Sequence, residues 1–167
     1  MIRLYDIGRD EKYKRPKLLV KRNFKREINI KDTIAFTKFV TEDLELNKYD
    51  NEHVYLITTD YYDNIIGTFL ISIGDFKGCE IYPRNIATAI LLSGGRKFLI
   101  MHNHPDGVLE FSESDVTIVS IMKGISILLK TEFINSYIFT SKGFITDTMN
   151  SPMYYDQMGG INLCRQD

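Results

Sequence analysis

The sequence has few cysteines and no long apolar run. Among its 167 residues only Cys79 and Cys164 occur, and they form no Cys-x-x-Cys pair. A disulfide framework or a cysteine-based metal site is therefore not expected, and a reducing compartment fits. No stretch of about 18 apolar residues predicts a membrane span, and the N-terminus lacks the apolar core of a signal peptide. We therefore expect a cytoplasmic protein with no membrane association.

Net charge is also small, at −1, but the charges are unevenly distributed. Residues 1–30 carry a net charge of +6, and residues 31–167 carry a net charge of −7. A basic arm on an acidic body can indicate contact with nucleic acid. The alternative is a solvated extension that docks on its own acidic domain. We favour the alternative because the arm contains no recognisable binding motif.

The chain has the length and composition of one globular domain, with 44% hydrophobic and 26% charged residues. Residues 1–28 are expected to be irregular or weakly extended, and residues 147–167 to form a tail. Between them, hydrophobic spacing predicts alternating elements. These are a helix over 31–46, strands over 52–60 and 65–73, a helix over 83–94, a strand over 97–101, a helix over 113–129 and a strand over 132–140. Such alternation indicates a layered α/β or α+β domain.

Two histidines lie two residues apart where a predicted strand ends. In an extended chain His102 and His104 point to the same side, so both imidazoles can converge on one ion. Asp115 follows in the first turn of the next predicted helix, where its carboxylate can reach back toward them. Two imidazoles and one carboxylate leave the fourth position of a tetrahedral zinc open for water, as a catalytic site requires.

Hydrolysis by a zinc-activated water also needs a group that carries the proton. Glu52 is the best candidate, because it lies at the polar start of an otherwise apolar strand. Other readings of these residues are possible. A histidine pair can arise by chance, and Ser112-x-x-Asp115 is also a helix cap. Capping by Ser112 and metal binding by Asp115 can coexist.

Two other nucleic-acid enzyme patterns are not matched. The contiguous His-Asn-His segment differs from the HNH nuclease signature, whose residues are spread over a longer hairpin and helix. The zinc deaminase pattern requires His-x-Glu and a later Pro-Cys-x-x-Cys, and the sequence contains neither.

The order and spacing of these residues resemble the motif of the JAMM (JAB/MPN) zinc metalloproteases. Within that group the chain is similar to the JAB domain of bacterial RadC proteins. The resemblance covers about residues 30–146. It rests on four features: His102-x-His104 followed by Ser112-x-x-Asp115, Glu52 eight residues before Asp60, the helix entry Tyr82-Pro83-Arg84-Asn85-Ile86, and the signature His102-Asn103-His104-Pro105-x-Gly107.

The resemblance implies a fold and a set of site residues. The fold is α/β, a JAB/MPN-type (cytidine-deaminase-like) mixed β-sheet flanked by helices. The implied organisation is a basic extension over 1–29, the JAB domain over 30–146 and a tail over 147–167. Zn²⁺ is implied on His102, His104 and Asp115, with Glu52 as general acid/base and Ser112 supporting the oxyanion of the tetrahedral intermediate.

The resemblance also implies a reaction. JAMM enzymes cut peptide or isopeptide bonds, often next to a ubiquitin-like tail, so we expect a zinc-dependent hydrolase acting on a protein or peptide substrate. The alternative is a DNA-associated accessory protein that uses the basic arm. A non-catalytic scaffold of the MPN type comes last, because such scaffolds usually lose ligands. The sequence leaves a homo-oligomer open.

The loop beside the proposed zinc departs from the family pattern. Asp106 replaces the usual serine, Phe111 replaces a proline, and Asn135-Ser136 replaces a late Asp-His pair. These changes alter the rim of the site and leave its ligands in place. We expect Asp106 and Glu110 to contact the substrate, the alternative being that this loop is a plain connector.

Overall fold

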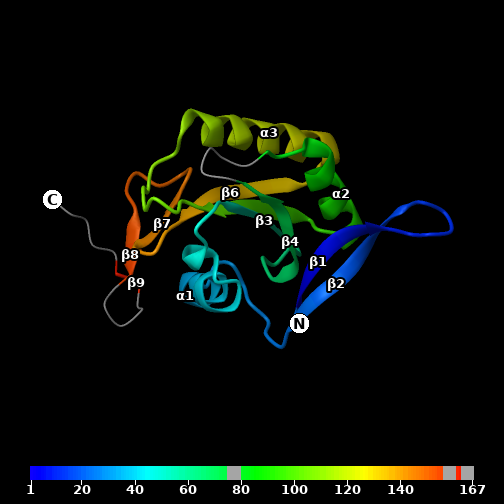
Figure 1. Cartoon of the computed structure of the whole chain (residues 1–167), viewed down its shortest axis with the longest axis horizontal. Helices are drawn as coiled ribbons and strands as arrows, with labels where there is room; N and C mark the ends of the chain where they lie inside the picture. The colour runs from blue at the N-terminus through cyan, green and yellow to red at the C-terminus, as the bar shows by residue number, and fades with distance from the viewer. Residues whose placement is uncertain (75–79, 156–160, 163–167) are drawn as a thin grey trace.

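A mixed sheet forms the centre of the computed structural model, which describes residues 1–74, 80–155 and 161–162. Within these residues nine strands lie in the order β2-β1-β4-β3-β5-β6-β7-β8-β9. Their bounds are β1 (Ile2–Arg9), β2 (Pro16–Phe24), β3 (His53–Thr59), β4 (Ile65–Ile73), β5 (Lys97–Asn103), β6 (Glu132–Phe139), β7 (Gly143–Thr146), β8 (Met153–Tyr155) and β9 (Ile161–Asn162). Helices cover both faces (Figure 1). The predicted mixed sheet flanked by helices is confirmed.

The two helices on one face begin and end where the sequence predicts. α2 (Pro83–Ser93) starts with proline in its first turn and ends at Gly94, whose φ of 71° suits glycine. α3 (Glu113–Leu129) starts after Ser112. Figure 1 shows both helices on the same side of the sheet.

The opposite face carries shorter helical segments. They are α1 (Thr33–Lys38), the π-helical turn η1 (Phe39–Asp43) and the 3₁₀ turn η2 (Leu46–Lys48). The single helix predicted over 31–46 is therefore wrong in its extent. The backbone widens where the Leu44 amide donates to the Phe39 carbonyl at 3.0 Å, and Glu45 adopts a left-handed conformation (φ 54°) that stops the helix.

Strand β3 separates two hydrophobic cores, because all seven of its residues are buried. Val54 and Leu56 face the core beneath α2 and α3. Tyr55 and Ile57 face the core beneath α1 and η1. Alternation along one buried strand thus fixes which side chains meet each helical layer.

Both ends of the described chain contain strands that the hydrophobic pattern did not predict. Residues 1–28, expected to be irregular or weakly extended, form the β1–β2 hairpin, and residues 147–167, expected as a tail, contain β8 and β9. The N-terminal strands join the sheet because Ile2 is buried in one core and Tyr5 packs against the other. Cys79 and Cys164 lie outside the described residues.

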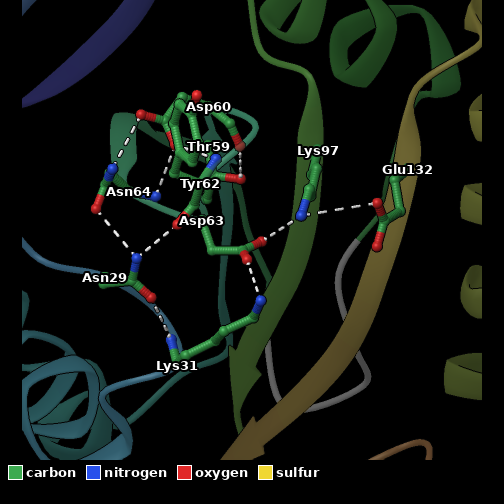
Figure 2. Close-up of polar contacts among 9 residues, drawn as sticks. All are labelled: Asn29, Lys31, Thr59, Asp60, Tyr62, Asp63, Asn64, Lys97 and Glu132. Carbon is green, nitrogen blue, oxygen red and sulfur yellow. Dashed lines mark hydrogen bonds and ion pairs between the residues drawn. The ribbon is translucent and has the colours of Figure 1, made fainter.

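The turn between β3 and β4 is built by polar side chains (Figure 2). One carboxylate oxygen of Asp60 accepts hydrogen bonds from the amides of Tyr62 and Asn64, at 2.8 and 2.9 Å. Asp63 has a φ of 69°, which Asp and Asn tolerate better than most residues. The predicted hairpin and its turn are confirmed. Among the described residues, no helix combines the length and apolar character needed to cross a membrane.

Candidate metal centre

The two motif histidines lie at the end of β5, on the face covered by α3. His102 pairs with Val54 of β3, and Val54 belongs to the core beneath α2 and α3. His104 follows two residues later, where its amide donates to the Phe139 carbonyl at 3.0 Å. The sheet therefore holds His102 rigidly and keeps the His104 backbone attached to the end of β6.

His102, His104 and Asp115 converge on one point. The Nε2 atoms of His102 and His104 are 3.0 Å apart, His102 Nε2 lies 3.1 Å from Asp115 Oδ1, and His104 Nε2 lies 3.7 Å from Asp115 Oδ2. A tetrahedral zinc with bonds of about 2.0–2.2 Å separates its ligand atoms by roughly 3.3–3.6 Å. The three side chains therefore form a group that can hold a metal ion. The convergence expected from the sequence is present.

A backbone carbonyl determines how His104 presents its ring. His104 Nδ1 lies 2.8 Å from the carbonyl oxygen of Val108. Since a carbonyl only accepts, Nδ1 carries the proton, and the neutral ring then presents a lone pair at Nε2, as a metal ligand requires. Sequence reasoning missed this contact, because a main-chain acceptor leaves no trace in residue identity.

Ser112 and Asp115 form a capping box at the start of α3. The Asp115 amide donates to Ser112 Oγ at 3.2 Å, and Asp115 Oδ2 accepts from the Ser112 amide at 2.8 Å. Ser112 Oγ also donates to Oδ2, at 2.6 Å. These bonds hold Oδ2 and leave Oδ1 directed at His102. Capping and the approach to the histidines therefore coexist.

Asp115 is buried, with 6% of the residue exposed, yet its environment favours the ionised carboxylate. Burial alone would raise its pKa. The hydrogen bond and charge of His102, with the hydrogen bonds from Ser112, outweigh burial and hold the pKa of Asp115 well below its usual value. The carboxylate is therefore present as the anion that a divalent cation needs.

Glu52 lies directly before β3, at the same end of the sheet as the histidines. The ladder between β3 and β5 ends at the pair Val54 and His102, and its register, extended two residues outward, places Glu52 at the level of His104. The Glu52 carbonyl accepts from the Gly74 amide at 2.8 Å, and the residue is half-buried. The role of Glu52 as general acid/base stays a prediction, as does that of Ser112 at the oxyanion.

Some residues of the loop expected to contact substrate are used to form a turn within that loop. Asp106 Oδ1 accepts from the Val108 amide at 3.0 Å, and Gly107 has a φ of 79° that favours glycine. Leu109 is buried and attaches the loop to the body, whereas Asp106 and Glu110 are exposed. Asp106 thus has a structural role, and substrate contact by Asp106 and Glu110 stays a prediction.

One buried polar residue at this end of the sheet, Asn103, is not among the site residues predicted from the sequence. Asn103 lies between the two histidines and is 1% exposed. Strand alternation turns its side chain to the opposite face from His102 and His104. A side-chain amide within an otherwise apolar, buried strand is the feature of the sequence that could have identified Asn103.

Comparison with known proteins places these features in one family. Residues 30–148 match the model of the RadC-like JAB domain. A UPF0758 protein of Gloeothece citriformis is 31% identical over 90 residues, which are 54% of this chain and 36% of that protein. A UPF0758 protein of Chlorobaculum tepidum is 27% identical over 116 residues, 70% of this chain and 52% of that protein. The matched regions thus span about a third to a half of these relatives.

Proposed function

The chain belongs to the RadC-like JAB domain family, and from this premise we propose that it is a zinc-dependent hydrolase of the JAMM type that cleaves a peptide or isopeptide bond. The observation that carries the proposal is the convergence of His102, His104 and Asp115, whose ligand atoms all lie within 4.8 Å of one another. Two nitrogens and one oxygen match the donor set of catalytic zinc sites that keep one position open.

Each residue of the site is assigned a separate role in the proposed reaction. Zinc bound here would supply a Lewis acid that activates water near neutral pH. Val108 and Ser112 orient two of the ligands through the hydrogen bonds at His104 and Asp115. Glu52, which lies directly before the neighbouring strand β3, is the group we assign to move the proton from water to the leaving amine. The substrate is a protein or peptide.

The proposal predicts both metal content and Glu52-dependent cleavage. Protein purified without chelators should contain about one zinc per chain by elemental mass spectrometry, and His102→Ala should remove it. A proteome-derived peptide library, read by mass spectrometry, supplies the substrates. Glu52→Gln should keep the zinc and slow cleavage by about 10²–10⁴-fold, the usual contribution of a general acid/base.

A matched control is Glu132→Gln. Glu132 also lies at the start of a strand, β6, but it pairs with Lys97 at the other end of β5. Its replacement should leave zinc content and cleavage unchanged. Zinc well below one per chain, or equal cleavage by Glu52→Gln and wild type, would contradict the proposal.

A second candidate function is contact with single-stranded DNA through the tip of the β1–β2 hairpin. Residues 9–17, hereafter the hairpin tip, carry five Lys/Arg and two Asp/Glu. Tyr13 at the tip is 60% exposed, and Lys12 and Arg15 lie over its ring at 5.0 and 5.2 Å from the centroid. Cations beside an exposed aromatic ring are the elements of a sequence-tolerant single-strand site.

The base of the hairpin behaves differently from its tip. The Arg26 guanidinium lies 2.9 Å from an Asp43 carboxylate oxygen, and Arg22 donates to the Asp43 carbonyl at 3.1 Å. The base therefore docks on the acidic domain, as one reading of the charge pattern expected. The tip projects beyond the sheet (Figure 1), so the DNA alternative rests on the tip alone.

A further inference from the structure

Asn103 joins the strand that carries both histidines to the segment that carries Glu52. Its Oδ1 accepts from the His53 amide at 2.7 Å. Its amide nitrogen donates to the carbonyls of Tyr49 and Asn51, at 3.2 and 3.0 Å. The side chain cannot be reversed, because reversal would face the NH₂ group with an N–H donor and the oxygen with two carbonyls.

Two of these three bonds hold the residues directly before and after Glu52. Asn51 precedes Glu52 and His53 follows it, and Asn103 holds a backbone atom of each. The His53 ring reinforces the segment, because it stacks on Tyr49 at 3.8 Å and its Nδ1 lies 3.1 Å from the Asn51 carbonyl. The backbone of Glu52 therefore has little freedom to move relative to β5.

The two chain neighbours of Asn103 are the histidines of the candidate metal centre, His102 within β5 and His104 directly after it. Because strand alternation sends His102 and His104 to one face and Asn103 to the other, a single strand end organises two parts of the site. We propose that Asn103 is a positioning residue that holds the segment 49–53, and with it Glu52, in register with His102, His104 and Asp115. This inference rests on the proposed function for the role of Glu52, whereas the holding itself can be measured independently.

The first test measures the holding by amide hydrogen exchange on the full-length chain. Asn103→Ala should accelerate exchange in residues 49–53 by about tenfold or more, because the opening of that segment no longer breaks three hydrogen bonds. Zinc content should stay at one per chain. Asn103→Asp has the same volume, keeps an acceptor for the His53 amide and loses both donors. Asn103→Asp should show the same acceleration. If the alanine variant does not fold, hydrogen exchange in residues 49–53 of Asn103→Asp decides the test.

Asn29 supplies a matched control. Its amide nitrogen donates to the Tyr62 carbonyl at 2.6 Å, and its Oδ1 accepts from the Lys31 amide at 3.0 Å, so it also joins two backbone segments. It lies beside the β3–β4 turn, at the far end of β3 from Glu52 (Figure 2). Asn29→Ala should leave exchange in residues 49–53 and cleavage unchanged. Unaltered exchange of that segment in both Asn103 variants would overturn the inference.

The second test asks whether Asn103 acts through Glu52. With the best-cleaved peptide of the library, Asn103→Ala should lower kcat by about 10²-fold and change KM by less than about threefold. The double variant with Glu52→Gln should be no slower than Glu52→Gln alone, because residues that act as a unit are not additive. Losses that multiply would overturn the inference. A wild-type chain that cleaves no peptide would defeat the proposed function and leave the exchange result to decide the holding.

Discussion

At the scale of single residues, the hydroxyl of Ser112 both caps the helix α3 and orients the carboxylate of the candidate metal centre. The hydroxyl accepts from the Asp115 amide and donates to Asp115 Oδ2. The first bond satisfies one of the free amides at the start of α3, and the second orients the carboxylate of the candidate metal centre. Removal of one hydroxyl should therefore change two independent measurements.

Replacement of Ser112 by alanine should lower stability and weaken metal binding together. We expect the free energy of unfolding of the metal-free protein to fall by about 1 kcal/mol, as for other lost N-caps. Zinc affinity should fall by about 10–100-fold, as for other lost partners of metal ligands. Denaturant unfolding and competition with a chromogenic chelator measure the two effects.

Asp32→Ala separates these two effects. Asp32 is the N-cap of α1 and accepts from the Ala35 amide at 3.0 Å, on the opposite face of the sheet. Its replacement should destabilise the protein to a similar extent with no change in zinc affinity. A Ser112→Ala variant with wild-type zinc affinity would show that the hydroxyl acts only as a cap.

The convergence of His102, His104 and Asp115 could be predicted from the sequence, because short-range geometry determines it. Alternation along a strand brings His102 and His104 together, and the capping pattern places Asp115 in the first turn of a helix. The carbonyl of Val108 and the buried amide of Asn103 could not be assigned in the same way. Their partners are main-chain atoms of other segments, and these depend on the complete fold.

At the scale of elements, the turn that joins β3 to β4 depends on one nearly buried carboxylate. Asp63 has 5% of its side chain exposed, and its two oxygens lie 2.6 and 2.7 Å from the ammonium groups of Lys31 and Lys97 (Figure 2). The hydrogen bond from Lys31 and, to a smaller extent, that from Lys97 lower the pKa of Asp63 despite its burial. Asp63 also raises the pKa of Lys97.

Replacement of Asp63 by asparagine should remove a stabilising effect that depends on pH. Because the folded-state pKa is depressed, this contribution is present above the unfolded-state pKa of about 3.9 and is lost as pH falls through the folded-state pKa. Asparagine tolerates the left-handed backbone at this position, so the turn itself is kept. We expect a loss of about 3 kcal/mol at pH 7, the low end of the range for broken buried ion pairs, because the Lys31 side chain is 78% exposed.

Urea unfolding at pH 7 and pH 3 measures this effect. The difference between wild type and Asp63→Asn should shrink at the lower pH. Lys97→Ala should cost more than Lys31→Ala, because the side chain of Lys97 is 15% exposed and that of Lys31 is 78% exposed. A difference that does not depend on pH would show that shape, and not charge, explains the role of Asp63.

The elements that sequence predicted best are those with local start and stop signals. α2 has Pro83 and Gly94 at its ends, and the β3–β4 turn has its own Asp and Asn side chains. The helix over 31–46 failed because its apolar spacing does not reveal a π-helical turn or the left-handed Glu45. The β1–β2 hairpin was missed because the strands gain their stability from contacts with a distant part of the chain.

At the scale of the whole molecule, positive charge is concentrated on one projecting hairpin. Lys12→Glu combined with Lys14→Glu should weaken binding of a fluorescein-labelled single-stranded 20-mer of DNA by about tenfold or more, and added salt should weaken wild-type binding in the same direction. Tyr13→Ala should weaken it further, because about 1–3 kcal/mol per base is lost with a stacking ring. Fluorescence anisotropy measures all three effects.

Net charge must be matched in the control for this experiment. Lys38 and Lys123 are exposed on α1 and α3, away from the hairpin, and their reversal to glutamate changes the net charge by the same amount. Equal losses in both pairs would indicate only non-specific attraction, and no loss in the tip variant would exclude the hairpin tip as a DNA site. A labelled RNA of the same sequence tests whether the sugar matters.

Apart from the β3–β4 hairpin, the order of the nine strands in the described part of the chain could not be read from the sequence. Neighbours in the sheet such as β1 and β4 pair in parallel across more than sixty residues, Leu4 with Thr68. Hydrophobic alternation shows that a strand has buried faces but does not name its neighbour. Within the candidate site, the segment from His102 to Asp115 could be predicted because its geometry does not depend on which strands are neighbours.

The position of the histidines on β5 has a consequence for how the protein assembles. His102 pairs with Val54 on one side and with Ile138 on the other, partners that lie far from it along the chain. Closing such distant pairs is the slow, entropically costly part of folding. The complete group of His102, His104 and Asp115 therefore exists only after the central strands have paired. Under the proposed function, zinc binding during refolding should not precede the pairing of these strands.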